Sequence, residues 1–314
     1  MVRSRRPRAG RPGRYYAGGV LSSPYTDLER PPLGEAALRR ALVVPGGVWT
    51  SLRLHAETGS TNEDAAAAAR AGAPEGLVVV AERQTAGRGR CGRAWESPAR
   101  GGLAVSVLLR PTGTDVQREW AGVPAARFGW LPLLAGVAVV AAVAARAEVA
   151  DAALKWPNDL LVGARKCGGI LAETVPGGPG DDPAVVVGIG VNVTLRTGEL
   201  PDERATSLLL AGAAHTDRDP LLRAVLRNLA GWYERWRDAG GDAAACGLRA
   251  AYLDACATIG HEVRVALPGP AYLTGTATTV DGDGRLVVTL PDGTVQTVAA
   301  GDVVHLRPES DPCA

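Results

Sequence analysis

Residues 87–95 read GRGRCGRAW and combine residue types that can hold an anionic ligand. Arg88, Arg90 and Arg93 supply guanidinium groups, which form bidentate hydrogen bonds with carboxylate or phosphate oxygens. The glycines let the backbone approach a ligand closely, and the indole of Trp95 offers a flat face for stacking. The segment therefore predicts a loop for a nucleotide-like anion, although a solvated basic turn has the same composition.

The same residues spell G-x-G-x-x-G, the pattern of loops that bind a dinucleotide. That fingerprint requires a strand before the glycines and a long helix after them. A strand is expected over 77–82, but the following RAWESPARGG is broken by proline and glycine and leads into another strand. A P-loop also fails, because Arg93-Ala94 stands where Lys and Ser or Thr are needed. We therefore interpret the glycines as a means of close approach and mobility, and not as a Rossmann turn.

Lysine is rare in this chain, which makes its positions informative. The sequence has 34 Lys plus Arg, and lysine occurs only at 155 and 166. Where arginine is favoured so strongly, a lysine indicates that a compact ammonium group on a flexible stem is required. Lys155 opens the motif KWPNDLLV, whose Pro-Asn-Asp segment predicts a hairpin turn between two short strands. Asparagine is also scarce, and positions 62, 158 and 192 all fall in the motifs described here.

The motif STNED at residues 60–64 matches the capping box of a helix, with Ser60 as N-cap and Glu63 three residues later. A helix N-terminus with spare hydroxyl groups is also a natural place to receive a polar ligand group. Capping alone would explain Ser60, so the structural and the functional interpretations both remain open at this motif.

The elements expected around these motifs form a mixed sheet. Apolar periodicity predicts a short helix around 34–41 and longer helices over 62–71, up to about 146, over 220–239 with Asp219 as N-cap, and over 244–258. Strands are expected over 77–82, 103–109, 153–156, 160–162, 168–174 and 184–193. So many strands with short or hairpin-like links favour an antiparallel or mixed sheet over a series of βαβ units.

Three regions are expected along the 314 residues. Residues 1–45 form a basic extension that we expect to be disordered, and residues 46–257 form the ligand-binding domain. After Gly260 the chain changes to short strands separated by turns such as DGDG and PDG, which suit hairpins. Residues 258–310 are therefore expected to form a small β-barrel-like domain.

Composition excludes several classes of protein. The apolar run 131–145 contains a proline and a glycine and is shorter than the roughly 20 residues of a membrane span, so we expect a buried helix. The N-terminus lacks the apolar stretch of a secretory signal, which predicts a cytoplasmic protein. The five cysteines form no C-x-x-C pair and the four histidines are far apart in sequence, so reduced thiols and no structural zinc are expected.

The net charge of +1 hides an uneven distribution, because residues 1–14 carry six arginines and no acidic residue. Such an arm could touch nucleic acid. Its proline and glycine content without an apolar pattern favours a disordered tail, and DNA binding is not expected.

Together these segments resemble the biotin protein ligases, which join biotin to a lysine of carboxylase carrier proteins. The resemblance rests on STNED, ERQTAGRGRCGRAW, KWPNDLLV, RKCGGILAE, VVVGIGVNV and RATSL, in the order and spacing of that family over residues 58–210. It implies an α+β fold with a mixed, largely antiparallel sheet flanked by helices, similar to class II aminoacyl-tRNA synthetases and lipoate ligases. It also implies a C-terminal SH3-like barrel. No N-terminal DNA-binding domain is found, so the chain resembles the monofunctional type.

The resemblance also assigns candidate site residues by motif position. Those implied for biotin are Ser60, Thr61, Asn62, Gln84, Arg88, Gly89, Arg90 and Lys155, with Gly168 and Gly169 lining the site. Those implied for ATP and the adenylate are Arg93, Trp95, Lys166 and Asn192. Lys155, Arg88 and Arg90 are the candidate catalytic residues, and no metal ligand is assigned.

The implied reaction has two steps. Biotin and ATP, with Mg²⁺, give biotinyl-5′-AMP and pyrophosphate, and a lysine of a biotin carboxyl carrier domain of an acyl-CoA carboxylase then takes the biotinyl group. The biotin carboxylate is already ionised at neutral pH, so the first step needs cations and not a general base. A lipoate or octanoate ligase of the same fold is the closest alternative. An adenylate-binding regulator that uses the basic arm on DNA is the alternative from a different class.

Overall fold

The computed structural model of the protein describes residues 30–177, 182–267, 271–299 and 301–306. The chain divides into two units, Met1–Pro31 and Pro32–Ala314, and every helix and strand below belongs to the second unit. The arginine-rich arm at residues 1–14 lies outside the described residues. The boundaries expected at 45 and 257 remain predictions.

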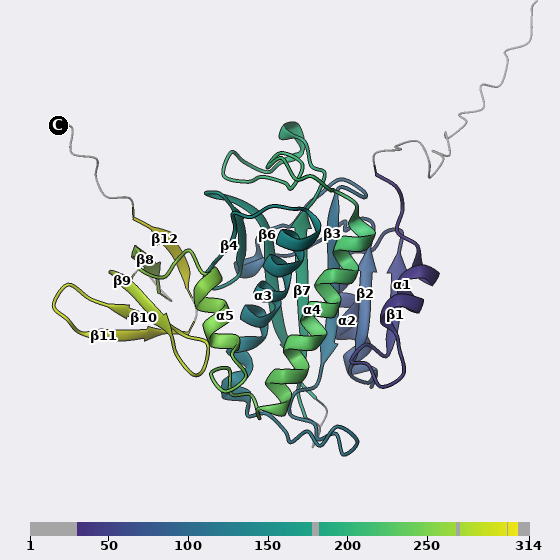
Figure 1. Cartoon of the computed structure of the whole chain (residues 1–314), viewed down its shortest axis with the longest axis horizontal. Coiled ribbons are helices and arrows are strands. Elements are labelled where there is room, and N and C mark those ends of the chain that lie inside the picture. Colours follow the sequence, from purple (N-terminus) through teal and green to yellow (C-terminus); the bar gives the residue numbers. More distant parts are fainter. Residues whose placement is uncertain (1–29, 178–181, 268–270, 300, 307–314) are drawn as a thin grey trace, which may run out of the picture. The chain divides into compact units, whose positions relative to one another are not determined.

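A seven-stranded sheet forms the centre of the second unit (Figure 1). Its order is β1 (Ser51–His55), β2 (Leu77–Ala81), β3 (Gly102–Leu109), β7 (Ala184–Asn192), β6 (Arg165–Val175), β5 (Asp159–Val162) and β4 (Ala152–Lys155). Only β1 and β2 pair in parallel, and every other neighbouring pair is antiparallel. The expected mixed, largely antiparallel sheet is confirmed, and β1 is a strand that the sequence pattern did not predict.

Helices cover the two faces of this sheet unequally. One face carries α1 (Glu35–Leu42), α3 (Trp130–Arg146), α4 (Arg218–Asp238) and α5 (Leu248–Ala255), whose apolar residues share one core with the sheet. The other face carries α2 (Thr61–Arg70), which packs its alanines on Leu77, Val79, Leu108 and Val186. The alternation along β2 explains this division, since Val78 and Val80 face the larger core and Leu77 and Val79 face α2. The face that carries α2 is the less covered one.

Helix α3 is the buried helix predicted from the apolar run. The helical segment Ala125–Arg146 is long and apolar enough to cross a membrane, with a mean hydropathy of 2.1. However, 61% of its most apolar window is buried within the protein, between the sheet and α4. This burial is what a core helix requires.

Both outer strands of the sheet are capped, which limits pairing with other chains. At β1, the guanidinium of Arg39 donates to the carbonyl of Leu52 at 2.9 Å. At β4, the backbone N–H of Ala257 donates to the carbonyl of Leu154 at 2.8 Å. The predicted helix 244–258 therefore ends early, at Ala255, because the following residues are extended and lie along β4.

One helix start also differs from the expectation. Helix α4 is capped by Asp217, whose carboxylate accepts from the backbone N–H of Asp219 at 3.0 Å. The prediction of Asp219 as N-cap is therefore wrong by two residues. Either aspartate suits an N-cap position by type, so sequence alone does not separate them.

The C-terminal region forms a second, five-stranded antiparallel sheet, in agreement with the expected small β domain. Its order is β11 (Val295–Val298), β10 (Leu286–Thr289), β9 (Tyr272–Val280), β8 (Glu262–Ala266) and β12 (Asp302–His305). The turn between β9 and β10 accepts hydrogen bonds from two buried indoles: Trp130 Nε1 donates to the carbonyl of Gly282 at 2.9 Å, and Trp156 Nε1 donates to that of Gly284 at 3.2 Å. The two sheets are therefore joined directly beside the KWPND motif.

A second link between the sheets runs through Thr258. Its Oγ1 accepts from the backbone N–H of Trp156 at 3.0 Å and lies 3.0 Å from Nε2 of His305, whose ring stacks on His261. Burial, together with the charges of Lys155 and His261, lowers the pKa of His305 to about 4. His305 is therefore neutral at neutral pH.

This shift predicts a loss of stability in acid. The folded His305 resists protonation down to about pH 4, whereas the unfolded residue takes up a proton near pH 6.5. Its contribution to the free energy of unfolding is therefore complete above pH 6.5 and is lost as the pH falls toward 4. We expect the thermal midpoint of the wild type to fall more steeply than that of His305→Asn over this range. The exposed His215→Asn is the control, and parallel curves for wild type and His305→Asn would contradict the prediction.

Candidate functional site

The strand register places four motif positions side by side on one face of the large sheet. Lys155 pairs with Asp159, Asp159 with Gly169, and Gly169 with Gly190. Directly opposed residues of antiparallel strands point to the same face. The row therefore runs from an ammonium group on β4 to a glycine surface on β6 and β7, on the face that carries α2.

Glycines form the floor of this face because other parts of the chain lie directly on their backbone. A Cβ added to Gly188 would lie 2.1 Å from Oδ1 of Asn62, and one added to Gly190 would lie 2.6 Å from the indole of Trp95. A Cβ added to Gly169 would lie 3.6 Å from the same indole and 3.6 Å from the side chain of Lys166. The alternating glycines of VGIGVN therefore admit one side chain each, which is a steric role.

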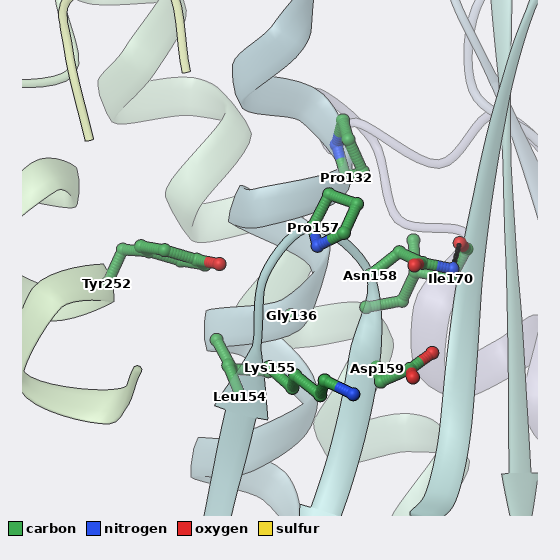
Figure 2. Close-up of a pocket in the computed structure, with 9 residues that line it drawn as sticks. All are labelled: Pro132, Gly136, Leu154, Lys155, Pro157, Asn158, Asp159, Ile170 and Tyr252. Atoms are coloured by element: carbon green, nitrogen blue, oxygen red, sulfur yellow. Dashed lines mark hydrogen bonds between the residues drawn. The ribbon is translucent and has the colours of Figure 1, made fainter. Parts of the chain in front are cut away.

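Lys155 is half-buried at the end of β4 and extends toward Asp159 (Figure 2). Within the described residues its ammonium makes no hydrogen bond or ion pair, since Asp159 bonds Lys166 instead, at 2.5 Å. Burial lowers the pKa of Lys155; the carboxylates of Asp159 and Asp302 oppose this shift, and Lys166 adds to it. A half-buried cation without a partner is a binding point for an anion.

The space on the other side of the hairpin is not a ligand site. It lies between the hairpin, α3 and Tyr252 of α5, as Figure 2 shows, and it does not admit a water molecule. We therefore expect a ligand of Lys155 to approach over the glycine floor.

Lys166 links the row to the RATSL motif. Besides its bond to Asp159, its backbone N–H donates to the carbonyl of Arg204, and its carbonyl accepts from the N–H of Thr206, both at 2.8 Å. Asn192 holds the same motif, because its side-chain Nδ2 donates to the carbonyl of Thr206 at 2.9 Å. These contacts bring VGIGVN, RKCGG and RATSL together.

The start of α2 is capped by Gln84 and not by the predicted capping box. Ser60 stands at the N-cap position but makes no capping bond with its side chain. Instead, Oε1 of Gln84 accepts from the backbone N–H of Thr61 at 2.8 Å and lies 3.0 Å from its hydroxyl. Glu63, the other member of the predicted box, pairs with Arg88 at 2.5 Å. The capping-box prediction is wrong because partners distant in sequence satisfy these groups.

Asn62 is held at both ends of its amide. Its Nδ2 donates to Glu173 at 2.6 Å and to the carbonyl of Leu171 at 3.3 Å, and its Oδ1 accepts from Ser106 at 2.6 Å. Asn62, Thr61 and Ser60 are all buried at the start of α2. This part of the site is therefore preorganised by the protein itself.

The arginine loop, defined as residues 87–95, closes on itself and contacts three different elements. Backbone bonds join Trp95 to Gly87 at 2.8 Å and Gly89 to Arg93 at 2.7 Å. Arg88 pairs with Glu63 of α2, and Arg93 pairs with Asp302 of β12. Arg90 donates to Asn158 of the β4–β5 hairpin at 3.2 Å and to the carbonyl of Gly301 at 3.3 Å. The loop therefore bridges α2, the Lys155 hairpin and the C-terminal sheet.

Most of the predicted site residues lie around this floor. The start of α2 with Gln84, the arginine loop, Lys155, Lys166 and Gly169 surround it, as the contacts above show. Gly168 differs, since alternation turns it toward Leu160 on the opposite face of the sheet. The amide of Asn192 is buried and bonded to the protein, and Arg93 reaches outward to β12.

Four further residues shape the site without having been predicted: Ser106, Asp159, Glu173 and Asp302. Each is a polar residue among apolar neighbours or motif residues, as in GLAVSVLL and GGILAE. That contrast was the available signal for Ser106 and Glu173. Asp159 stood inside KWPND, and nothing in the sequence pointed to Asp302.

Three carboxylates of this region, Glu63, Asp159 and Asp302, are already paired with cations, and Glu173 accepts from the amide of Asn62. Within the part of the chain that the structure describes, no group of three His, Cys, Asp or Glu side chains could hold a metal ion. A divalent ion would therefore have to enter with a ligand that supplies most of its coordination.

Comparison with known proteins agrees with this geometry. Residues 55–192 match the biotin/lipoate A/B protein ligase family, and residues 258–306 match the biotin protein ligase C-terminal domain. The chain is 43% identical over 284 residues to the biotin–acetyl-CoA-carboxylase ligase of Mycobacterium tuberculosis, which covers 90% of this chain and 98% of that protein. That relative is named for ligase activity alone, in agreement with the predicted type.

Two solved structures are similar in fold. The biotin protein ligase from Aquifex aeolicus in complex with biotin and ATP has a TM-score of 0.63 and 28% identity, and the match covers 83% of this chain and 100% of that one. The biotin protein ligase from Leishmania major in complex with biotinyl-5-AMP has a TM-score of 0.51 and 26% identity, over 80% of this chain and 99% of that one. With the sequence matches across both sheets, these similarities show that the chain belongs to the biotin protein ligase family.

Proposed function

We propose that the protein is an ATP-dependent biotin protein ligase that forms biotinyl-5′-AMP and transfers biotin to a lysine of a biotin carboxyl carrier domain. The observation that carries the proposal is the unpartnered ammonium of Lys155, which faces a glycine floor on the same side of the sheet as the start of α2. Family membership supports the choice of biotin, since the relatives in this family are named for it.

Biotin would lie across the strands. Its carboxylate would meet Lys155 on β4, and its ring system would meet Ser60, Thr61 and Gln84 near β7. Three strand spacings separate β7 from β4, which is roughly 14 Å at about 4.8 Å each, so the flexible lysine stem and an extended acid together bridge the span. Gly169 and the backbone of Gly89 would line the acid.

The cations of the site suit the first step. An ionised carboxylate attacks a triphosphate, and two like charges at about 4 Å repel by roughly 4 kcal/mol at an effective dielectric of 20. Lys155 and Lys166 would offset this repulsion and stabilise charge on the α-phosphate. The ATP would carry Mg²⁺ on its phosphates, as Mg²⁺ commonly binds.

The adenylate needs protection, because a mixed anhydride is destroyed by water. The arginine loop lies over the floor with Trp95 on Gly190, where an indole offers a stacking face for a base. We propose that Trp95, Arg93, Lys166 and Asn192 serve the adenylate, with Asn192 acting through the RATSL segment that it holds. A loop that covers the intermediate and then opens for the acceptor lysine has a direct use in this sequence of steps.

The cellular setting follows from the same proposal. The described cysteines are free thiols, and two of them are buried, which supports a reducing cytoplasmic compartment. The acceptor would be a carrier domain of an acyl-CoA carboxylase, as the name of the Mycobacterium relative implies.

A direct test is incubation of the full chain with ATP, Mg²⁺ and a biotin carboxyl carrier domain, in parallel with biotin or with lipoate. The acceptor mass should rise by one biotinyl group, and only with biotin. A rise with lipoate, or no rise with either acid, would overturn the proposed function.

Lys155 provides a first prediction. Lys155→Met keeps the stem but removes the ammonium, so biotin-dependent pyrophosphate release should fall about 100-fold or more. Arg165→Met removes a positive charge from the exposed start of β6 and should leave the rate within about twofold of the wild type. Equal rates for wild type and Lys155→Met would rule out the assigned role.

Lys155 also predicts the form of the pH profile. The ammonium binds the carboxylate only while protonated, and its pKa lies below the usual 10.5. The value of kcat/KM for biotin should therefore decline on the alkaline side as Lys155 deprotonates, below pH 10.5. Lys155→Arg removes this decline, because arginine stays protonated. An unchanged alkaline limb in Lys155→Arg would assign the titration to another group.

Asp302 provides a prediction for loop closure. Asp302→Asn removes the charge that holds Arg93 against β12, and an exposed pair of this kind contributes about 0.2–1 kcal/mol. Without an acceptor, biotinyl-5′-AMP should therefore escape about two- to fivefold faster than from the wild type. Asp254→Asn, on the exposed side of α5, is the control. Unchanged escape from Asp302→Asn would show that this contact does not hold the loop.

A further inference from the structure

A chain of hydrogen-bonded side chains crosses the site from β6 to the loop after β2. It begins at Glu173, passes through Asn62 and Ser106, and ends at Thr61 and Gln84. The Oγ of Ser106 lies 2.6 Å from Oδ1 of Asn62 and 2.7 Å from Oγ1 of Thr61, and Thr61 lies 3.0 Å from Oε1 of Gln84. Five side chains from four separate parts of the sequence therefore form one continuous network.

The centre of the network is buried and its two ends, Glu173 and Gln84, are half-buried, so the central groups depend on one another and not on water. Ser106 is fully buried, and Thr61 and Asn62 are nearly so. Gly188 makes this possible, since any side chain there would occupy the position of Asn62. A buried polar network of this kind is stable only in an arrangement that satisfies all of its members.

Glu173, at 2.6 Å, and the carbonyl of Leu171, at 3.3 Å, decide together which way the amide hydrogens of Asn62 point, and Glu173 makes the shorter bond. A carboxylate accepts hydrogen bonds and donates none, so the NH₂ of Asn62 must face Glu173 and its oxygen must face Ser106. Ser106 then gives its single proton to Asn62, which leaves its oxygen to accept. The backbone bond from Thr61 fixes the oxygen of Gln84 toward α2, so the NH₂ of Gln84 faces the arginine loop at Gly87.

The end of the network at Thr61 and Gln84 therefore has a defined arrangement of hydrogen-bond donors and acceptors. The proton of Thr61 is drawn toward Ser106 or Gln84, so the hydroxyl keeps a lone pair for an incoming N–H. The NH₂ of Gln84 offers a donor for an incoming carbonyl. A cyclic urea carries both N–H donors and a carbonyl acceptor, whereas the dithiolane of lipoate and the alkyl chain of octanoate carry neither.

We propose that Glu173 is a positioning residue for substrate selection: through Asn62 and Ser106 it fixes the acceptor side of the Thr61 hydroxyl, which together with the NH₂ of Gln84 admits the ureido ring of biotin. Glu173 itself touches neither biotin nor ATP. The inference rests on the proposed function and deepens it, because it says which half-buried charge makes the site selective for a urea.

Glu173→Gln is the test, because it keeps the size of the side chain and replaces an acceptor by an amide that also donates. Asn62 then loses its charged acceptor, and only the longer bond to the carbonyl of Leu171 still favours its orientation. We expect the KM for biotin in pyrophosphate release to rise about tenfold while kcat at saturating biotin stays within about twofold. The preference for biotin over an analogue methylated on a ureido nitrogen should shrink by a similar factor. Glu173→Asp keeps the carboxylate and should recover part of the affinity, and Glu234→Gln on α4 is the matched control.

Ser106→Ala separates this role from general destabilisation. It removes the link between Asn62 and Thr61, so by itself it should raise the KM for biotin with kcat preserved. In the Ser106→Ala background, Glu173→Gln should have no further effect, since its path is already broken. Independent, multiplying effects would overturn the proposal, as would an unchanged KM in Ser106→Ala, which remains decisive even if Glu173→Gln does not fold.

Pyrophosphate release by the wild type distinguishes a failure of the role of Glu173 from a failure of the proposed function. If the wild type releases pyrophosphate with biotin but Glu173→Gln keeps the wild-type KM and analogue preference, only the role of Glu173 is overturned. If the wild type does not use biotin, the proposed function and the role of Glu173 fall together.

Discussion

The site depends on the close approach of side chains to a sheet that carries glycine at alternate positions. Gly188 and Gly190 on β7 leave the backbone bare, so Asn62 and Trp95 lie where a Cβ would otherwise stand. Asn62 brings the start of α2 down onto the sheet, and Trp95 brings down the arginine loop. Between these two contacts and Lys155 lies the region where we place the acid and its adenylate. A methyl group at either glycine would lift one of the two elements from the floor.

Charge is distributed around this floor so that, within the described residues, the ammonium of Lys155 remains available. Lys166 is neutralised by Asp159, Arg88 by Glu63 and Arg93 by Asp302. Lys155 has no such partner among the described residues, and burial already works against its charge. A carboxylate that reaches Lys155 therefore gains an ion pair without displacing an existing one, which favours binding of an acid at this position.

The sequence predicted the residues whose chemistry is unusual for their surroundings, and it missed those whose role arises only on folding. Lys155 was recognisable because lysine is rare, and the mixed sheet because many strands follow one another with short or hairpin-like links. Gln84 as the cap of α2 was not predictable from spacing, since Thr61 and Gln84 are 23 positions apart and meet only through the sheet. Ser60 and Glu63 match the local pattern of a capping box, but Gln84 caps the helix instead and Glu63 pairs with Arg88. Asp302 reaches the site from the second sheet, and the sequence pattern of β12 does not indicate its contact with Arg93.

The arginine loop must both close over an intermediate and open for two substrates, and the exposure of its contacts bears on that balance. The pairs of Arg88 and Arg93 are at least a third exposed on each side, so each contributes only about 0.2–1 kcal/mol. The bonds of Arg90 to Asn158 and Gly301, at 3.2 and 3.3 Å, are long for charged donors. Together they hold the loop closed by a few kcal/mol at most, which thermal motion overcomes on the timescale of enzyme loops. Stronger, buried contacts would protect the adenylate better but would also keep biotin and the acceptor lysine out.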